Sequence, residues 1–120
     1  MFEKFTIPKS ASFISQLELI NNLSESNEKI GEAIRRKFNA DAQGKLFQTQ
    51  VIGDTKKIIK ALIISRLAAD IENIPDQELR KPFWGRVQQL CEYYSISWED
   101  IAFLLRHASE FEEIENQNSD

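Results

Sequence analysis

The sequence has little of what a catalytic or cofactor-binding site usually needs. It contains one histidine, His107, and one cysteine, Cys91, so it offers no pair of histidines at zinc spacing and no internal disulfide. Its four glycines stand apart, at positions 31, 44, 53 and 85, and none forms a phosphate-binding loop. A Cys91–His107 dyad would need both side chains in one cleft, but the helical pattern turns Cys91 inward. We therefore expect no enzymatic activity, no metal and no cofactor.

Glycine and proline are also scarce, with four and three residues in a chain of 120. Such a composition argues against a turn-rich β-sandwich and against a disordered chain. The most apolar run is interrupted by Arg66, Asp70 and Glu72, which excludes a membrane span, and the first residues lack the pattern of a signal peptide. A single cysteine fits a reducing compartment. We expect one cytoplasmic domain with no membrane partner.

That run, residues 56–74, is the most informative part of the chain. Its letters are KKIIKALIISRLAADIENI, and its apolar residues recur every three or four positions. Additional isoleucine and alanine residues widen the apolar face until little polar surface remains. The pattern predicts a central helix over about 54–73. Whether Gly53 breaks a longer helix is left open, because one glycine in a helix costs only about 1 kcal/mol.

The flanking segments predict an all-α fold, a compact bundle of five or six helices in a single domain over residues 1–115. Ser10 or Ser12 can cap a first helix that ends near Leu23, and a second helix should end near Phe38. Residues 1–9 are read as an extended arm over the core, and residues 116–120 as a frayed acidic tail.

Two further helices are expected in the second half of the chain. One should start near Pro82, because proline fits the first turn of a helix. The last should run from Trp98 to about Phe111, because Ser97 and Asp100 have the spacing of a capping box.

The window 87–106 has the layout of a helix-turn-helix, with two helices joined by residues 95–97. Its second helix, however, would present Glu99 and Asp100 with Arg106 as its only base. Phosphates repel carboxylates, so we do not expect this helix to read DNA.

Basic residues are concentrated between positions 29 and 66, where nine bases face three acids for a local charge of +6. The simpler interpretation is that these bases form a solvated face whose positive charge is balanced by the acidic residues of the C-terminal segment. The alternative is a nucleic-acid surface that contacts phosphates through charge alone. Its candidate residues are Arg35, Arg36, Lys37, Lys45, Lys56, Lys57 and Lys60.

The chain has more aromatic residues than one small core readily buries. Three residues with ring side chains, Phe103, His107 and Phe111, follow one another at a spacing of four and form a stripe on the predicted last helix. Exposed aromatic residues at helical spacing are typical of protein interfaces. The resulting hypothesis is a small interaction or regulatory protein that binds another protein, or a second copy of itself as a homodimer. The competing interpretation is that the early arm, with Phe2 and Phe5, covers this stripe. The candidate partner-binding residues are Trp84, Phe103, His107 and Phe111.

Overall fold

The computed structural model describes residues 5–40 and 55–118, and within these ranges it contains six α-helices and no strand. The predicted all-α bundle is therefore confirmed. The segment 41–54, which holds Gly53, lies outside the described residues. The helices are α1 (Phe13–Ser26), α2 (Glu28–Ala40), α4 (Thr55–Glu72), α5 (Gln77–Tyr94), α6 (Trp98–Arg106) and α7 (Ala108–Asn118).

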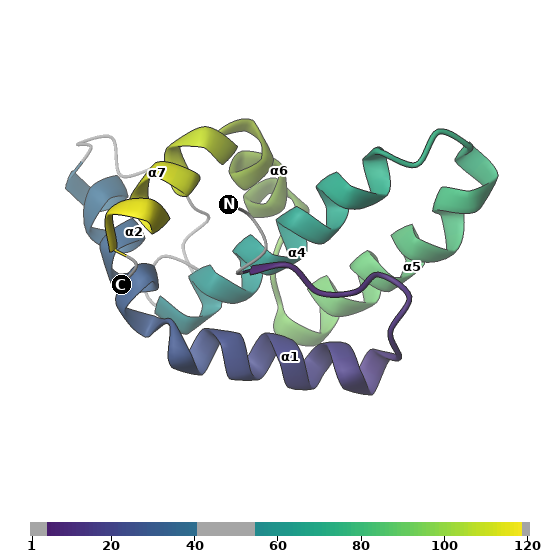
Figure 1. Ribbon diagram of the computed structural model, residues 1–120, viewed down its shortest axis with the longest axis horizontal. Helices are drawn as coiled ribbons and strands as arrows, with labels where there is room; N and C mark the ends of the chain where they lie inside the picture. Colours follow the sequence, from purple (N-terminus) through teal and green to yellow (C-terminus); the bar gives the residue numbers. More distant parts are fainter. Residues whose placement is uncertain (1–4, 41–54, 119–120) are drawn as a thin grey trace.

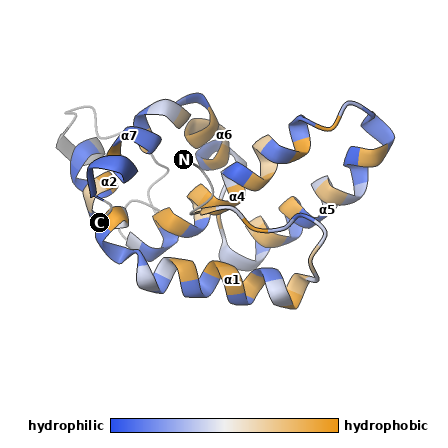
Figure 2. Ribbon diagram, in the orientation of Figure 1, coloured by the Kyte–Doolittle hydropathy of each residue, from blue (hydrophilic) through white to orange (hydrophobic). Residues whose placement is uncertain are grey.

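Helix α4 forms the centre of the bundle, as its sequence predicts. Every residue from 61 to 68 is buried, including polar Ser65 and Arg66. Helices α1, α2, α5 and α6 all contact α4 (Figure 1), and hydrophobic residues follow it through the middle of the molecule (Figure 2). Burial of apolar surface is the main driving force for folding, and α4 contributes more buried residues than any other described helix. None of the described helices is long and apolar enough to cross a membrane.

Helices α2 and α4 approach each other closely at Gly31. A Cβ atom added to Gly31 would lie 2.4 Å from the carbonyl oxygen of Thr55 and 3.3 Å from Cγ1 of Ile59. Since the first contact is with rigid backbone, only glycine fits at this crossing.

Helix α5 begins earlier than the sequence prediction. Asp76 is its N-cap and accepts a hydrogen bond from the backbone N–H of Glu78 at 2.9 Å, so the helix starts at Gln77. Pro82 therefore lies inside the helix, and its expected place in the first turn is wrong. The aspartate directly after Pro75 is the cap that the prediction overlooked.

The predicted last helix is in fact two helices. It ends at Arg106, and His107, with φ −114° and ψ 29°, turns the chain into α7. This turn lets both Phe103 and Phe111 reach the interior, where their ring centroids are 6.0 Å apart. Helix α7 continues to Asn118, so the segment expected to fray after residue 115 is helical in its described part.

The chain before α1 lies across the bundle, with Phe5 and Ile7 buried (Figure 1). The buried side chain of Gln16 holds this segment, because its Nε2 donates to the carbonyl oxygen of Pro8 at 2.9 Å. Arg86 completes the contact, with Nη1 donating to Oε1 of Gln16 at 2.8 Å and to the carbonyl oxygen of Ala11 at 2.9 Å. The arm is thereby joined to α1 and α5 at once.

Candidate binding groove

The turn between α5 and α6 brings the two tryptophans of the chain together. Ser95 has a left-handed backbone conformation, with φ 57° and ψ 46°, and the N–H of Ile96 bonds the carbonyl oxygen of Cys91 at 2.9 Å. Ser97 then caps α6 by accepting the N–H of Asp100 at 3.2 Å, as predicted. Trp98 is consequently the first residue of α6 and faces back toward α5. Its ring centroid lies 5.9 Å from that of Trp84, with the two planes 76° apart.

A hollow of about 580 Å³ lies beside these rings. Buried Val87 contributes an apolar surface, whereas Trp98 is 51% exposed and Trp84 is half-buried. We call this hollow the tryptophan groove. Its lining residues are Glu72, Trp84, Val87, Gln88, Cys91 and Trp98.

An ion-paired carboxylate lies at the edge of the groove. The Glu72 side chain is more than half exposed, and its Oε2 accepts a hydrogen bond from Nη1 of Arg80 at 3.1 Å. Burial raises the pKa of the Cys91 thiol to about 11, and the adjacent Glu92 carboxylate adds to the rise. The thiol is therefore protonated at neutral pH and is a poor nucleophile. The groove can bind an apolar or cationic group, but it shows no activated nucleophile.

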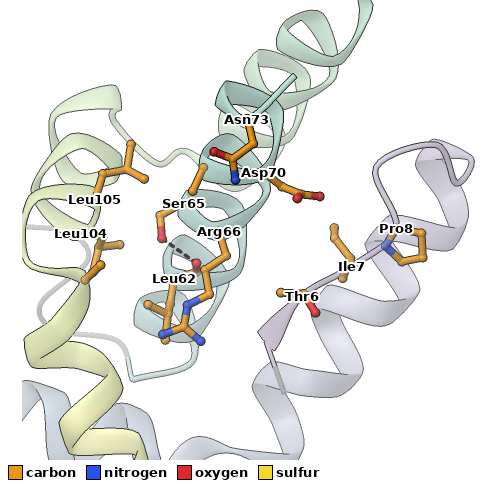
Figure 3. A pocket seen from close by; sticks show the side chains of 12 residues that line it. Thr6, Ile7, Pro8, Leu62, Ser65, Arg66, Asp70, Asn73, Leu104 and Leu105 are labelled. Atoms are coloured by element: carbon orange, nitrogen blue, oxygen red, sulfur yellow. Dashed lines mark hydrogen bonds between the residues drawn. The ribbon is translucent and has the colours of Figure 1, made fainter. Parts of the chain in front are cut away.

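A second hollow, of about 710 Å³, lies between the arm, α4 and α6 (Figure 3). It has two charged lining residues. Asp70 pairs with Nζ of Lys9 at 3.4 Å. Arg66 is almost fully buried and forms a two-point ion pair with buried Glu115 of α7, with Nη1 2.9 Å from Oε1. The hydroxyl of Ser65 donates to the carbonyl oxygen of Leu62 at 2.6 Å, so it turns back onto its own helix (Figure 3). Because these polar groups already have partners within the protein, this cleft is a weaker candidate than the tryptophan groove.

The predicted aromatic face is not exposed. Phe111 is fully buried and Phe103 is 7% exposed, so the expectation that they present a surface to a partner is wrong. His107 stacks on Phe103 with ring centroids 4.3 Å apart and pairs with Glu110. Among the four predicted partner-binding residues, Trp84 lines a hollow that a ligand can enter. The break at His107 caused the error, because the spacing of four assumed one straight helix.

The predicted basic surface is partly neutralised on α2. Arg35 pairs with Glu32, and Nε of Arg36 lies 4.0 Å from the same carboxylate. Lys37 is exposed, and Lys45 lies outside the described residues. One carboxylate thus neutralises part of the charge of both arginines, which lowers the positive charge that they can offer to phosphate.

The lysines at the start of α4 also lie beside groups that interact with their charge. Nζ of Lys56 lies 3.0 Å from the Glu25 carboxylate, and Nζ of Lys60 lies 5.1 Å from the centre of the Tyr94 ring. Lys57 is half-buried. Four of the candidate bases, Arg35, Arg36, Lys56 and Lys60, therefore have local partners, which reduces the positive charge that this surface can offer to phosphate.

Of the six residues that line the groove, the sequence analysis proposed Trp84 alone as a partner-binding residue, so Trp98 and Glu72 are among those that it missed. Trp98 was assigned to its helix, and Glu72 was seen only as an interruption of the apolar run. The signal that could have found Trp98 is its position directly after a capping serine, beside a turn that returns it to α5. Among residues 5–40 and 55–118, no cluster of histidine, cysteine or carboxylate side chains could hold a metal ion.

The chain was also compared with known proteins. No family model, no curated protein and no solved structure matches it. The function must therefore be inferred from the groove itself.

Proposed function

We propose that this protein is a small non-enzymatic interaction or regulatory protein that binds a segment of another protein in the tryptophan groove. The observation that carries the proposal is the pairing of Trp84 and Trp98 at the edge of a hollow, with Trp98 half exposed. Tryptophan is enriched among the residues that dominate binding energy at interfaces, and each aromatic side chain can bury roughly 150–250 Å². A single free thiol suits a reducing compartment, so we place this activity in the cytoplasm.

A homodimer through the same groove is the alternative within this proposal. A second copy would have to insert one of its own segments between α5 and α6. Light scattering distinguishes the two, because a homodimer doubles the mass in solution and Trp98→Ala should return it to that of one chain. Nucleic-acid binding is a weaker candidate, since Glu25 and Glu32 neutralise bases that it would need.

The test is selection of random peptides displayed on phage against the wild-type chain. We expect the selected peptides to bind wild-type protein and to lose at least tenfold in affinity against Trp98→Ala, in line with the loss of an interface anchor. Tyr93→Ala is the matched control. Tyr93 is a 58% exposed aromatic residue on α5, but it packs against Phe13 of α1, away from the groove lining.

Equal loss in both variants would mean that the peptides bind another surface or that aromatic truncation disturbs the fold. Circular dichroism of each variant separates these explanations. Failure to select any peptide whose binding depends on Trp98 contradicts the proposal.

A further inference from the structure

Resting on that proposed function, we propose that the tryptophan groove recognises a cationic side chain, a lysine or arginine of the partner segment, with Glu72 as its counter-charge. The occupant would enter the corner between the two indole rings. The groove would then select its partner by charge as well as by apolar contact.

The ring geometry supports a cation. The face of an aromatic ring carries negative electrostatic potential, and a cation is attracted when it lies within about 6 Å of the ring centre. The ring centroids of Trp84 and Trp98 are 5.9 Å apart and the rings meet edge to face, so the face of one ring and the uncovered part of the other's face form two walls of a corner. Such a corner can contact one positive group from two sides. Two parallel stacked rings would leave only their outer faces accessible to a cation, and these faces point in opposite directions.

The charges around the corner point the same way. Glu72 lines the groove itself, Glu92 lies near the thiol of Cys91, and Glu99 is exposed directly after Trp98. Arg80 already pairs with Glu72, but it bonds only one of the two carboxylate oxygens. A basic ligand therefore meets a carboxylate at the groove whose other oxygen can accept a hydrogen bond.

A neutral occupant would fit the groove less well. Leucine or phenylalanine would bury the same indole surface, but it would also remove water from Glu72 without supplying a partner beyond Arg80. Desolvating a charge without a hydrogen-bonding partner is unfavourable. The groove thus discriminates against apolar segments through its rim while it binds through its rings.

The chain carries its own reporter for the experiment, because both of its tryptophans line the groove. Intrinsic fluorescence is titrated with short peptides that differ only at one central residue, which is lysine, trimethyl-lysine, norleucine or the neutral tert-butyl analogue of trimethyl-lysine. We expect each cationic peptide to bind about 3- to 30-fold more tightly than its neutral counterpart. Added salt should reduce this preference.

Two variants locate the effect. Glu72→Gln should reduce the preference for the cation severalfold, because it removes the counter-charge of the cationic peptides and also the desolvation cost that the neutral peptides incur. Glu78→Gln is the matched control, because Glu78 is an exposed carboxylate that pairs with Lys81 at 3.0 Å and does not line the groove. It should behave as wild type.

The outcomes separate the two proposals. If peptides bind and depend on Trp98, but the neutral analogues bind as tightly as the cations, this inference is overturned and the interaction function stands. If no peptide changes the tryptophan fluorescence and none is selected through Trp98, the proposed function fails and this inference fails with it. A preference for cations that Glu72→Gln does not alter removes Glu72 as the counter-charge and overturns the inference as stated.

Discussion

The crossing of α2 and α4 gives the sharpest prediction about stability. Replacing Gly31 with alanine places a methyl group 2.4 Å from the Thr55 carbonyl oxygen, whereas ordinary contact begins near 3.4 Å. Since the oxygen belongs to helical backbone, α2 must move away by about 1 Å, the difference between these two distances. Overpacking of this kind destabilises by about 1–3 kcal/mol.

The matched control is Gly85→Ala. A methyl group at Gly85 meets no atom within 4 Å, and the residue is exposed inside α5. It should therefore stabilise the protein by roughly 0.5–1 kcal/mol through helix propensity alone. Because both variants gain the same propensity, the difference in their free energies of unfolding isolates the steric term at the crossing.

We expect Gly31→Ala to unfold about 1–3 kcal/mol more easily than Gly85→Ala. For a domain of this size, that difference corresponds to roughly 4–12 °C in Tm. Urea and thermal unfolding, followed by far-ultraviolet circular dichroism, measure both quantities. Equal stabilities for the two variants would refute the reasoning, because they would mean that α2 and α4 do not meet closely at Gly31.

Three further predictions concern other parts of the molecule. Glu115→Ala should lower the free energy of unfolding by about 3–5 kcal/mol, because it leaves the buried Arg66 guanidinium without its counter-charge. The double variant Arg66→Met, Glu115→Ala should recover most of this loss. Urea denaturation measures both changes, and a neutral single variant would contradict the prediction. Ser95→Gly should raise that free energy by about 0.5–1 kcal/mol, because glycine adopts φ 57° without strain; a fall in Tm would argue against the left-handed turn. The rate at which iodoacetamide alkylates Cys91 should keep rising with pH toward about 11 in the folded protein, and it should level off at a lower pH in urea. Because the thiol of the unfolded chain loses its proton at a lower pH, Cys91 should lower the free energy of unfolding as the pH rises from about 9 to 11.

The helical architecture was predictable because its signal is local. The isoleucine repeat between 56 and 74 fixes both the helical period and the burial of α4, and Ser12 and Ser97 mark the starts of α1 and α6 through a single side-chain hydrogen bond each. These features depend on neighbours within one or two turns. They can therefore be predicted without knowledge of the tertiary structure.

The groove was not predictable in the same way. No glycine or proline marks the turn at His107, so the spacing of four could not decide between an exposed aromatic stripe and one covered within the protein. The structure buries both Phe103 and Phe111. Trp84 and Trp98 meet only because the three-residue turn after α5 reverses the chain by an angle that spacing does not encode. Their proximity to Glu72 depends in addition on how α4 packs against α5.

The buried pair of Arg66 and Glu115 has a consequence for synthesis on the ribosome. The centre of the Phe5 ring lies 5.7 Å from the Arg66 guanidinium, so three segments that are far apart in the sequence, around residues 5, 66 and 115, meet at one point. The nascent chain must therefore carry its most buried helix, α4, without those neighbours until α5, α6 and α7 have been translated. During that interval the isoleucines of α4 are accessible to chaperones and to other nascent copies of the chain, and the Arg66–Glu115 ion pair forms only after α7 has been made.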